Sequence, residues 1–304
     1  FGDPGEIAMQ VGAVLIGRPP NRATYLAKDF GSQLANTWET IEQGLSRAIE
    51  FLHEEKIFDG RLLPSDPLLT LMAGFWATAP EGKDAEGAAR RLARRAFWTG
   101  AFSDRYQKTS ATRVALDTRQ LTAYRDGGDQ MPELLDADRT PLPTGAELKS
   151  GGWPKTKDRL GRAIMAASLR VGGYDFADEA PFGATNIDKR EYHHIFPKAL
   201  LETEFPKREV FSALNCALLS WRTNRTIGAK PPSVYIGERA QEIGIGNEEV
   251  ARRLRSHAIP AGALMSDDFN EFVEARSELV HKLMLKLCGG EPVGLHDVEL
   301  GEQT

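Results

Sequence analysis

Apolar residues recur along the first part of the chain with the period of an amphipathic helix. Between residues 33 and 55 they follow one another at alternating steps of four and three, which predicts one helix with a single buried face. That face carries Leu34, Trp38, Ile41, Leu45, Ala48 and Leu52. Ser32 stands where the N-cap of such a helix is expected.

Other segments with helical patterning lie on both sides of a stretch rich in Gly, Asp and Pro. They cover residues 68–76, 84–103, 111–124, 156–171 and 266–287. The stretch between them, at about residues 126–154, has the composition of a linker or long loop. We therefore expect a mainly α protein with a helical domain at 1–150, a second domain at 155–290 and a polar tail at 291–304.

Composition places the chain among soluble globular proteins. It has 304 residues, of which 41% are hydrophobic and 27% charged, which is enough to bury a core. Cys216 and Cys288 are the only cysteines, which excludes a disulfide scaffold and fits a reducing cytoplasm. The apolar stretch at residues 7–16 is too short to cross a bilayer, and no secretory signal pattern is visible. We expect a cytoplasmic protein without membrane partners, and the first residue, Phe1, suggests numbering that starts inside a longer chain.

Charge is distributed unevenly along the chain. Residues 189–230 contain eight basic and four acidic groups, so this window carries +4 while the whole chain carries −5. A locally basic surface on an acidic protein can bind phosphates. Ordinary charge scatter on a solvated surface explains the same counts, and charge alone favours it.

The chemically most informative segment is Tyr192-His193-His194-Ile195-Phe196-Pro197. Neighbouring side chains on a regular strand face opposite ways, so the two histidines can serve one site in different roles only where the strand breaks up. Pro197 indicates such a break, because proline ends regular strand pairing. Imidazole suits a general base that activates water near neutral pH.

Two asparagines follow the histidines at suggestive distances. Asn215 lies 21 residues after His194, and Asn224 lies nine residues further on. The amide oxygen of Asn215 is expected to accept from the ring of the base or from a nearby backbone group, and so to fix the base. The carbonyl oxygen of Asn224 is a hard ligand suited to Mg²⁺ or Mn²⁺.

This pattern resembles the HNH nuclease domain of GmrSD-type restriction proteins, the group that includes SspE and BrxU. The motifs that carry the resemblance lie at residues 193–197, 215–220, 224–226 and 231–235. Residues 94–99, with Arg105 and Tyr106, resemble the helical segment that precedes the nuclease in this group. The resemblance covers roughly residues 30–240, and its specific motifs lie within about 191–236. It implies a ββα-metal core, embedded in helices, within the domain at 155–290.

The resemblance also implies roles for individual residues. His194 would be the general base and Asn215 the residue that orients it, while His193 and Asn224 would hold the metal. Mg²⁺ is the expected metal. The group often has Asp where this chain has His193, and an imidazole ligand makes Mn²⁺, Ni²⁺ or Zn²⁺ alternatives. The expected phosphate contacts are basic residues that flank the site: Lys198, Arg222, Arg225 and Lys230.

The function that follows is a metal-dependent DNA endonuclease of the nicking type, acting in restriction or anti-phage defence. The nucleotide-hydrolysing amino-terminal half of the group carries an Asp-Gly-Gln-Gln-Arg-type motif that this chain lacks. We therefore expect the chain to be the carboxy-terminal part, with DNA and a missing nucleotide-hydrolysing domain as partners. Two alternatives stay open, namely a helical DNA-binding or interaction module with an inactive HNH centre, and an RNase.

Several other groups are assigned no part in this chemistry. The run of Arg90, Arg91, Arg94 and Arg95 is expected to pair with acids or with an absent domain. The aromatic residues expected in the core are Phe97, Trp98, Phe102 and Tyr106. The histidines without partners at useful spacing are His53, His257, His281 and His296.

Overall fold

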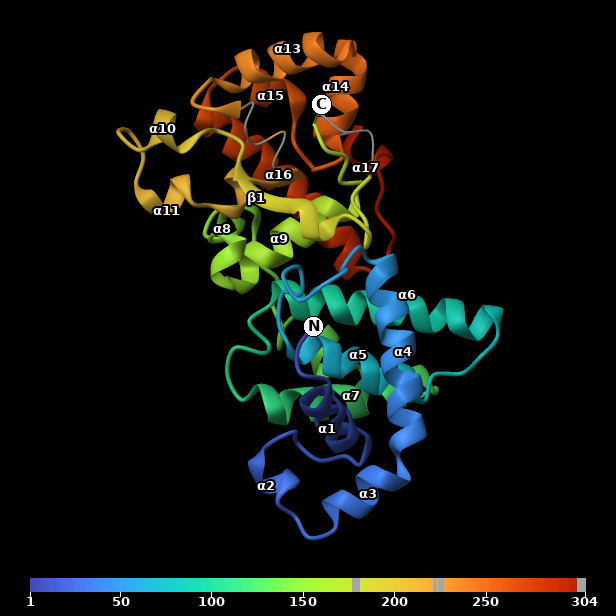
Figure 1. The fold of residues 1–304 in the computed structure, drawn as a ribbon. Helices are drawn as coiled ribbons and strands as arrows, with labels where there is room; N and C mark the ends of the chain where they lie inside the picture. Colours follow the sequence, from blue (N-terminus) through green and yellow to red (C-terminus); the bar gives the residue numbers. More distant parts are fainter. Residues whose placement is uncertain (177–180, 221–222, 224–226, 300–304) are drawn as a thin grey trace. The chain divides into compact units, whose positions relative to one another are not determined.

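The computed structural model describes residues 1–176, 181–220, 223 and 227–299, with only the backbone of Lys83 (Figure 1). The chain divides into two compact units, the first made of residues 1–142 and 287–291, the second of 143–286 and 292–304. Helices dominate both units, and the described residues form two strands. The prediction of a mainly α protein is therefore confirmed.

The first unit is built around one buried helix. Its elements are α1 Pro4–Leu15, α2 Arg22–Tyr25, α3 Phe30–Asn36, α4 Trp38–Glu54, α5 Pro67–Ala77, α6 Lys83–Phe102, α7 Ser110–Arg125 and the 3₁₀ turn η1 Glu133–Leu135. Residues 68–77 of α5 are all buried, and α1, α4, α6 and α7 pack against this helix. A helix that is apolar all round needs such cover on every side. A Cβ at Gly44 would lie 2.5 Å from the carbonyl oxygen of Ala73, so glycine permits the close crossing of α4 and α5.

The helix predicted at 33–55 is two helices that meet at Thr37. The Oγ1 hydroxyl of Thr37 donates to the carbonyl oxygens of Gln33 and Leu34, and such side-chain bonds compete with the helical backbone. Trp38 is 45% exposed and does not share the buried face, whereas Ile41, Ala48 and Leu52 do. Ser32 is no N-cap, since it lies inside α3 and donates to the carbonyl of Asp29. The prediction was wrong because periodicity does not register a local hydrogen bond.

Two arginines of the run at residues 90–95 pair with acids, as predicted, and the four aromatic residues predicted for the core are buried. Arg90 pairs with Glu54 and Glu86, and Arg94 donates to buried Glu55 at 2.8 Å. The aromatic side chains that the sequence predicts to lie in the core are all buried: Phe97, Trp98, Phe102 and Tyr106. They belong to the core, as expected, and a role in base stacking is excluded for buried rings.

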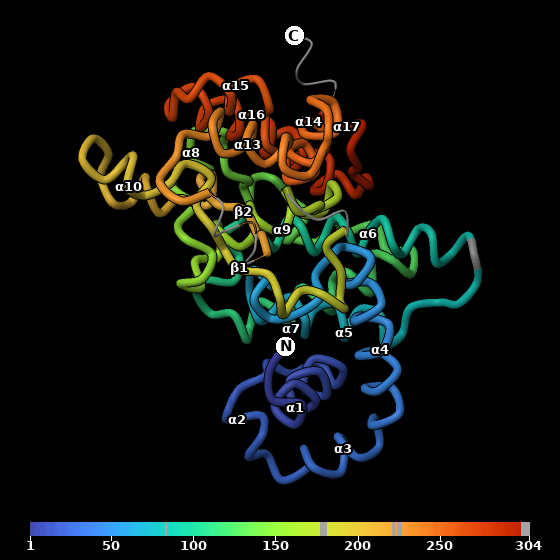
Figure 2. Tube along the Cα trace, turned by 45° about the horizontal axis from the view of Figure 1, so that its top comes forward, coloured from blue at the N-terminus to red at the C-terminus, as the bar shows by residue number. Residues whose placement is uncertain are grey.

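The second unit combines a short antiparallel strand pair with helices. Its helices are α8 Gly145–Leu148, α9 Arg159–Arg170, α10 Lys198–Leu201, α11 Lys207–Val210, α13 Pro232–Ile243, α14 Asn247–Arg255, α15 Ala261–Met265, α16 Phe269–Cys288 and α17 His296–Glu299. Its 3₁₀ turns are η2 Pro154–Thr156, η3 Ile187–Lys189 and η4 Ala213–Asn215. Strand β1 Arg190–His194 pairs with β2 Cys216–Ser220, with Arg190 opposite Ser220 and His194 opposite Cys216 (Figure 2). The last two residues of α16, Leu287 and Cys288, belong to the first unit.

The core of the second unit lies under the strand pair. It includes Ile195, Phe196, Ala217, Leu219 and Phe272, all buried. These residues come from β2, from the loop after β1 and from α16. The residues that follow the histidine pair and those of the paired strand are thus packed into this hydrophobic core.

Glycines 151 and 152 pack tightly against α9. A Cβ at Gly151 would lie 2.5 Å from Cδ1 of Ile164, and one at Gly161 would lie 2.0 Å from the carbonyl oxygen of Gly152. Asp158, the N-cap of α9, accepts from the backbone N–H groups of both Gly152 and Gly161 through its Oδ1 oxygen. The segment that leads into Trp153 is therefore fixed on the start of α9.

Within the described residues, no helix has both the length and the apolar character needed to cross a membrane.

Candidate active site

Strand β1 ends at the histidine pair. Beyond His194 the main chain turns away, with the N–H of Ile195 donating to the carbonyl of Asn215 at 3.0 Å and α10 starting after Pro197. The rings of His193 and His194 are 6.5 Å apart between centroids and lie at 84° to each other. The predicted break of the strand at this point is confirmed, and the two rings face different surroundings.

His193 is held in one tautomer by its own main chain. Its Nδ1 lies 2.9 Å from the carbonyl oxygen of His194, and a carbonyl only accepts, so Nδ1 carries the hydrogen. The lone pair then resides on Nε2. An imidazole with its other nitrogen bonded to a carbonyl is the usual arrangement of a metal ligand. The ring therefore fits the ligand role expected for it.

His194 lies between two aromatic side chains. Its ring stacks on Trp153 at 4.3 Å between centroids with 24° between planes, and meets Phe211 edge-on at 4.8 Å and 83°. Its Nε2 is buried and has no hydrogen-bond partner among the described residues. Burial lowers the pKa of His194 to about 4, helped by the charges of His193 and Lys198. The ring is neutral at pH 7, which is the form a general base needs.

Asn215 is fully buried and bonds to main-chain groups. Its Oδ1 accepts from the N–H of Phe196 at 2.8 Å, and its Nδ2 donates to the carbonyls of Phe196 and Val210, both at 3.1 Å. Tyr235 adds a fourth bond, from its hydroxyl to the carbonyl of Ile195 at 2.9 Å. The amide oxygen of Asn215 was expected to accept from the ring of the base or from a nearby backbone group, and in the structure it accepts from a backbone group. The asparagine fixes the loop behind the histidines and makes no hydrogen bond to the ring of His194.

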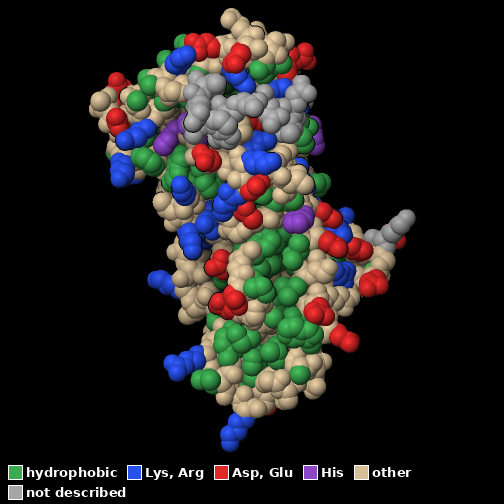
Figure 3. All heavy atoms as spheres, in the orientation of Figure 1, with side chains coloured by type: hydrophobic (Ala, Val, Ile, Leu, Met, Phe, Trp, Pro, Cys, Tyr) green, Lys and Arg blue, Asp and Glu red, His purple; other side chains and the backbone are tan. Residues whose placement is uncertain are grey.

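The expected phosphate-binding lysines are exposed and paired. Lys198 lies 3.0 Å from Glu202, and Lys230 pairs with Glu238. On the face drawn in Figure 3, Lys and Arg side chains of the second unit stand among Asp and Glu side chains. Exposed ion pairs contribute at most about 1 kcal/mol, so both lysines can exchange a carboxylate for a phosphate. The remaining expected residues, Arg222, Asn224 and Arg225, lie outside the described residues.

A buried acid at the other end of the strand pair escaped sequence reasoning. Asp175 is fully buried and accepts from Arg190 at 2.8 Å, from the N–H of Ser220 at 2.7 Å and from the hydroxyl of Thr223. It ties the start of β1 to the end of β2. Arg190, counted in the basic window, is thus an internal ion-pair partner and no phosphate contact. No sequence signal marks Asp175, because single acids are common in loops.

Arg276 of α16 supports the site from below. It is fully buried, and its guanidinium donates to the carbonyls of Leu214 at 2.8 Å and Cys216 at 3.0 Å, on either side of Asn215. It also donates to the carbonyls of His257 and Ala258. Burial lowers its pKa to about 10, so it stays charged at neutral pH. The sequence does mark Arg276 as unusual, because it falls on the apolar face of its helix, where a charged side chain is not expected.

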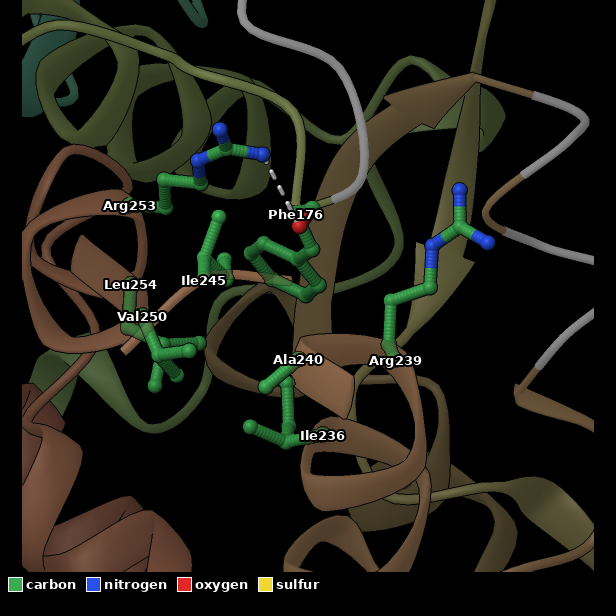
Figure 4. A pocket seen from close by; sticks show the side chains of 8 residues that line it. All are labelled: Phe176, Ile236, Arg239, Ala240, Ile245, Val250, Arg253 and Leu254. Atoms are coloured by element: carbon green, nitrogen blue, oxygen red, sulfur yellow. Dashed lines mark hydrogen bonds between the residues drawn. The ribbon is translucent and has the colours of Figure 1, made fainter. Parts of the chain in front are cut away.

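Two hollows of this unit lie away from the histidines. One is a cavity of about 10 Å³ lined by Phe176 and residues of α13 and α14, with room for about one water (Figure 4). The other is an open groove of about 490 Å³ between α10 and the start of α16, with Glu204, Asp267 and Asp268 on its wall. Carboxylates repel phosphates, so the groove does not suit a nucleic-acid backbone. Among the described residues, no cluster of three or more His, Cys, Asp or Glu side chains could hold a metal.

Comparison with known proteins gives limited help. No protein-family model matches the chain. A similar protein is the "Uncharacterized protein MJ0686" of Methanocaldococcus jannaschii, which is 24% identical over 219 residues. The match covers 63% of this chain and 36% of that protein, so the chain spans about a third of its relative's length. The description of that relative assigns it no activity.

Proposed function

We propose that this protein is a metal-dependent DNA endonuclease of the HNH type that nicks one strand and works in restriction or anti-phage defence. The observation that carries the proposal is the histidine pair at the end of β1, with Asn215 fixing the loop behind it. The Nδ1 of His193 is bonded to the carbonyl of His194, so the lone pair that could bind a metal is on Nε2, and burial lowers the pKa of His194 to about 4, so this ring is neutral at neutral pH. Both properties come from the local fold and agree with the roles that the resemblance to GmrSD-type nucleases implies.

Each residue has a defined part in the proposed reaction. His193 and Asn224 would hold a divalent cation, with Mg²⁺ expected and Mn²⁺, Ni²⁺ or Zn²⁺ as alternatives. The cation would stabilise charge that develops on the phosphate and the leaving oxygen. His194 would take the proton from the attacking water. Lys198, Lys230, Arg222 and Arg225 would hold the flanking phosphates.

Supercoiled plasmid with Mg²⁺, Mn²⁺ or Ni²⁺ provides the direct test. The parent is expected to convert it to open circles, and His194→Ala and Asn224→Ala are expected to lose this activity. His296→Ala is a matched control, because this histidine is 75% exposed and lies outside the site. Equal nicking by the parent and His194→Ala would remove the proposal. Single-stranded and double-stranded RNA in parallel reactions would identify an RNase.

Metal binding is measured separately from cutting. Mn²⁺ titration followed by water proton relaxation is expected to show weaker binding in His193→Ala than in the parent. His296→Ala should bind as the parent does. Unchanged Mn²⁺ affinity in His193→Ala would contradict the ligand role of this residue.

A binding module with an inactive centre is the second candidate, and one observation favours it. The buried Nε2 of His194 faces no hydrogen-bond partner among the described residues, whereas a general base must reach water. DNA binding in a gel-shift assay, together with no cleavage by folded parent protein under any of these metals, would favour this candidate over the nuclease.

A further inference from the structure

The imidazole of His194, the base proposed for the nuclease, contacts one aromatic side chain with its face and meets another edge-on. We propose that Trp153 is the positioning residue of His194, fixing the plane of its imidazole. This inference rests on the proposed function for its catalytic meaning. Its structural basis is the stacked contact at 4.3 Å and 24°, which covers one face of the ring.

Of the aromatic rings next to His194 among the described residues, that of Trp153 has the nearest centroid and the most nearly parallel plane. The hydrogen bonds of the Asn215 side chain all go to main-chain groups, and the buried Nε2 of His194 has no hydrogen-bond partner within the described part of the chain. Phe211 meets the ring edge-on at 4.8 Å. A face contact and an edge contact together restrict rotation of the imidazole about its bond to Cβ. Reacting groups that are misplaced by about 1 Å lose roughly a hundredfold in rate, so the restriction matters for catalysis.

Trp153 is itself held in place from two sides. Gly152 forms a β-bridge with Ser212, and the N–H of Ala213 donates to the carbonyl of Gly151 at 2.9 Å. Asp158 binds the N–H of Gly152 at 3.0 Å from the start of α9. The bridge also brings Phe211 to Trp153, with 5.6 Å between the ring centroids. Both aromatic contacts of His194 therefore depend on the short pairing of residues 151–152 with residues 212–213.

Three variants separate a positioning role from a general packing role. Trp153→Leu removes the flat surface, and Trp153→Phe keeps one. Phe205→Leu is the matched control, since Phe205 is partly buried in the same unit and packs on Phe269 at 4.8 Å. Plasmid nicking gives kcat and KM, and thermal unfolding reports folding. NMR of histidine ring protons, with His194 assigned through His194→Gln, reports the stack without metal or DNA.

The expected result is a kcat lowered about tenfold or more in Trp153→Leu, with KM within about twofold of the parent. Trp153→Phe should recover most of the rate, and Phe205→Leu should match the parent. In the NMR spectra, the upfield ring-current shift of His194 protons should vanish in Trp153→Leu alone.

A different pattern would overturn the inference. A folded Trp153→Leu with the kcat of Phe205→Leu, or with unchanged His194 proton shifts, would show that the indole does not position the ring. Failure of the proposed function looks different, because the parent itself would then not cut nucleic acid. In that event the ring-proton shifts alone decide whether Trp153 fixes His194.

Discussion

At the scale of single residues, the site depends on buried polar groups that bind main chain. Asn215 and Arg276 together make seven hydrogen bonds to backbone groups, which belong to the loop after β1, to the segment that leads into and begins β2 and to the residues after α14. Loops lack the regular ladder that satisfies backbone groups in strands, so a buried loop needs such partners. These side chains therefore set the path of the loop that follows the histidine pair.

Asn215→Ala should destabilise the second unit on the order of 3 kcal/mol. It leaves the N–H and carbonyl of Phe196 and the carbonyl of Val210 buried without their partner, and each unsatisfied group costs about 1–3 kcal/mol without full additivity. Urea unfolding followed by circular dichroism measures the loss. Asn270→Ala is the control, because Asn270 is exposed. Equal stability of the two variants would show that the loop does not need Asn215.

Arg276→Met should lower the free energy of unfolding by about 3 kcal/mol or more, since four buried carbonyls lose their donor. Arg276→Lys should recover only part of this loss, because an ammonium cannot reproduce the planar fork of the guanidinium. The same urea experiment tests both. Full recovery by lysine would mean that charge, and not donor geometry, is what the carbonyls require.

Sequence reasoning reached the candidate histidines and Asn215 but not the other residues that support them. His193, His194 and Asn215 stood out because two adjacent histidines are followed by asparagines at the spacing of an HNH motif. Trp153 and Asp175 act through tertiary contacts with segments far along the chain, and no local pattern shows these. Arg276 was within reach, since a lone cation inside an apolar stripe is unusual.

At the scale of elements, long periodic helices were predictable and short ones were not. Predictions at 84–103 and 111–124 lie within one residue of α6 and α7 at each end. Elements such as α2, α8, α10 and α11 have four residues each, which is about one turn and too short to show a period. The break at Thr37 was missed because a side-chain hydrogen bond caused it.

Glycines in two helices should respond oppositely to alanine. At Gly161 a Cβ would lie 2.0 Å from the carbonyl oxygen of Gly152, so Gly161→Ala must push residues 151–153 away from α9, at a cost of about 1–3 kcal/mol. At Gly87 of α6 nothing lies within 4 Å, so Gly87→Ala should stabilise by up to about 1 kcal/mol. Thermal unfolding of both variants gives the signs. A neutral Gly161→Ala would contradict the close packing that positions Trp153.

At the scale of the whole molecule, both units bury ion pairs, Asp175 with Arg190 in the second, and the second unit also buries a histidine. The first unit buries Glu55 with Arg94 and Asp117 with Arg105, which are ion pairs. The second unit buries His257, whose Nε2 lies 2.6 Å from the carbonyl oxygen of Tyr174 and whose Nδ1 has no partner among the described residues. A histidine buried in the neutral form makes folding sensitive to mild acid.

Acid should therefore weaken the second unit through His257. Burial lowers its pKa from 6.5 to about 4, with opposing contributions from the Tyr174 carbonyl and Asp175 and further lowering by Arg276 and Arg190. Below pH 6.5 the unfolded chain takes up the proton while the folded chain resists it down to about pH 4. Stability present above pH 6.5 is thus lost as the pH falls, by about 2 kcal/mol for this group between pH 7 and pH 5.

The variant His257→Gln keeps a donor for Tyr174 but cannot titrate, so its stability should fall by about 2 kcal/mol less than that of the parent over the same interval. Urea unfolding at pH 7 and pH 5 measures the difference. His296→Gln removes an exposed histidine and should keep the pH dependence of the parent. An identical pH dependence in His257→Gln would mean that the folded chain binds a proton at His257 as readily as the unfolded chain does, and the acid response would then have to come from other groups.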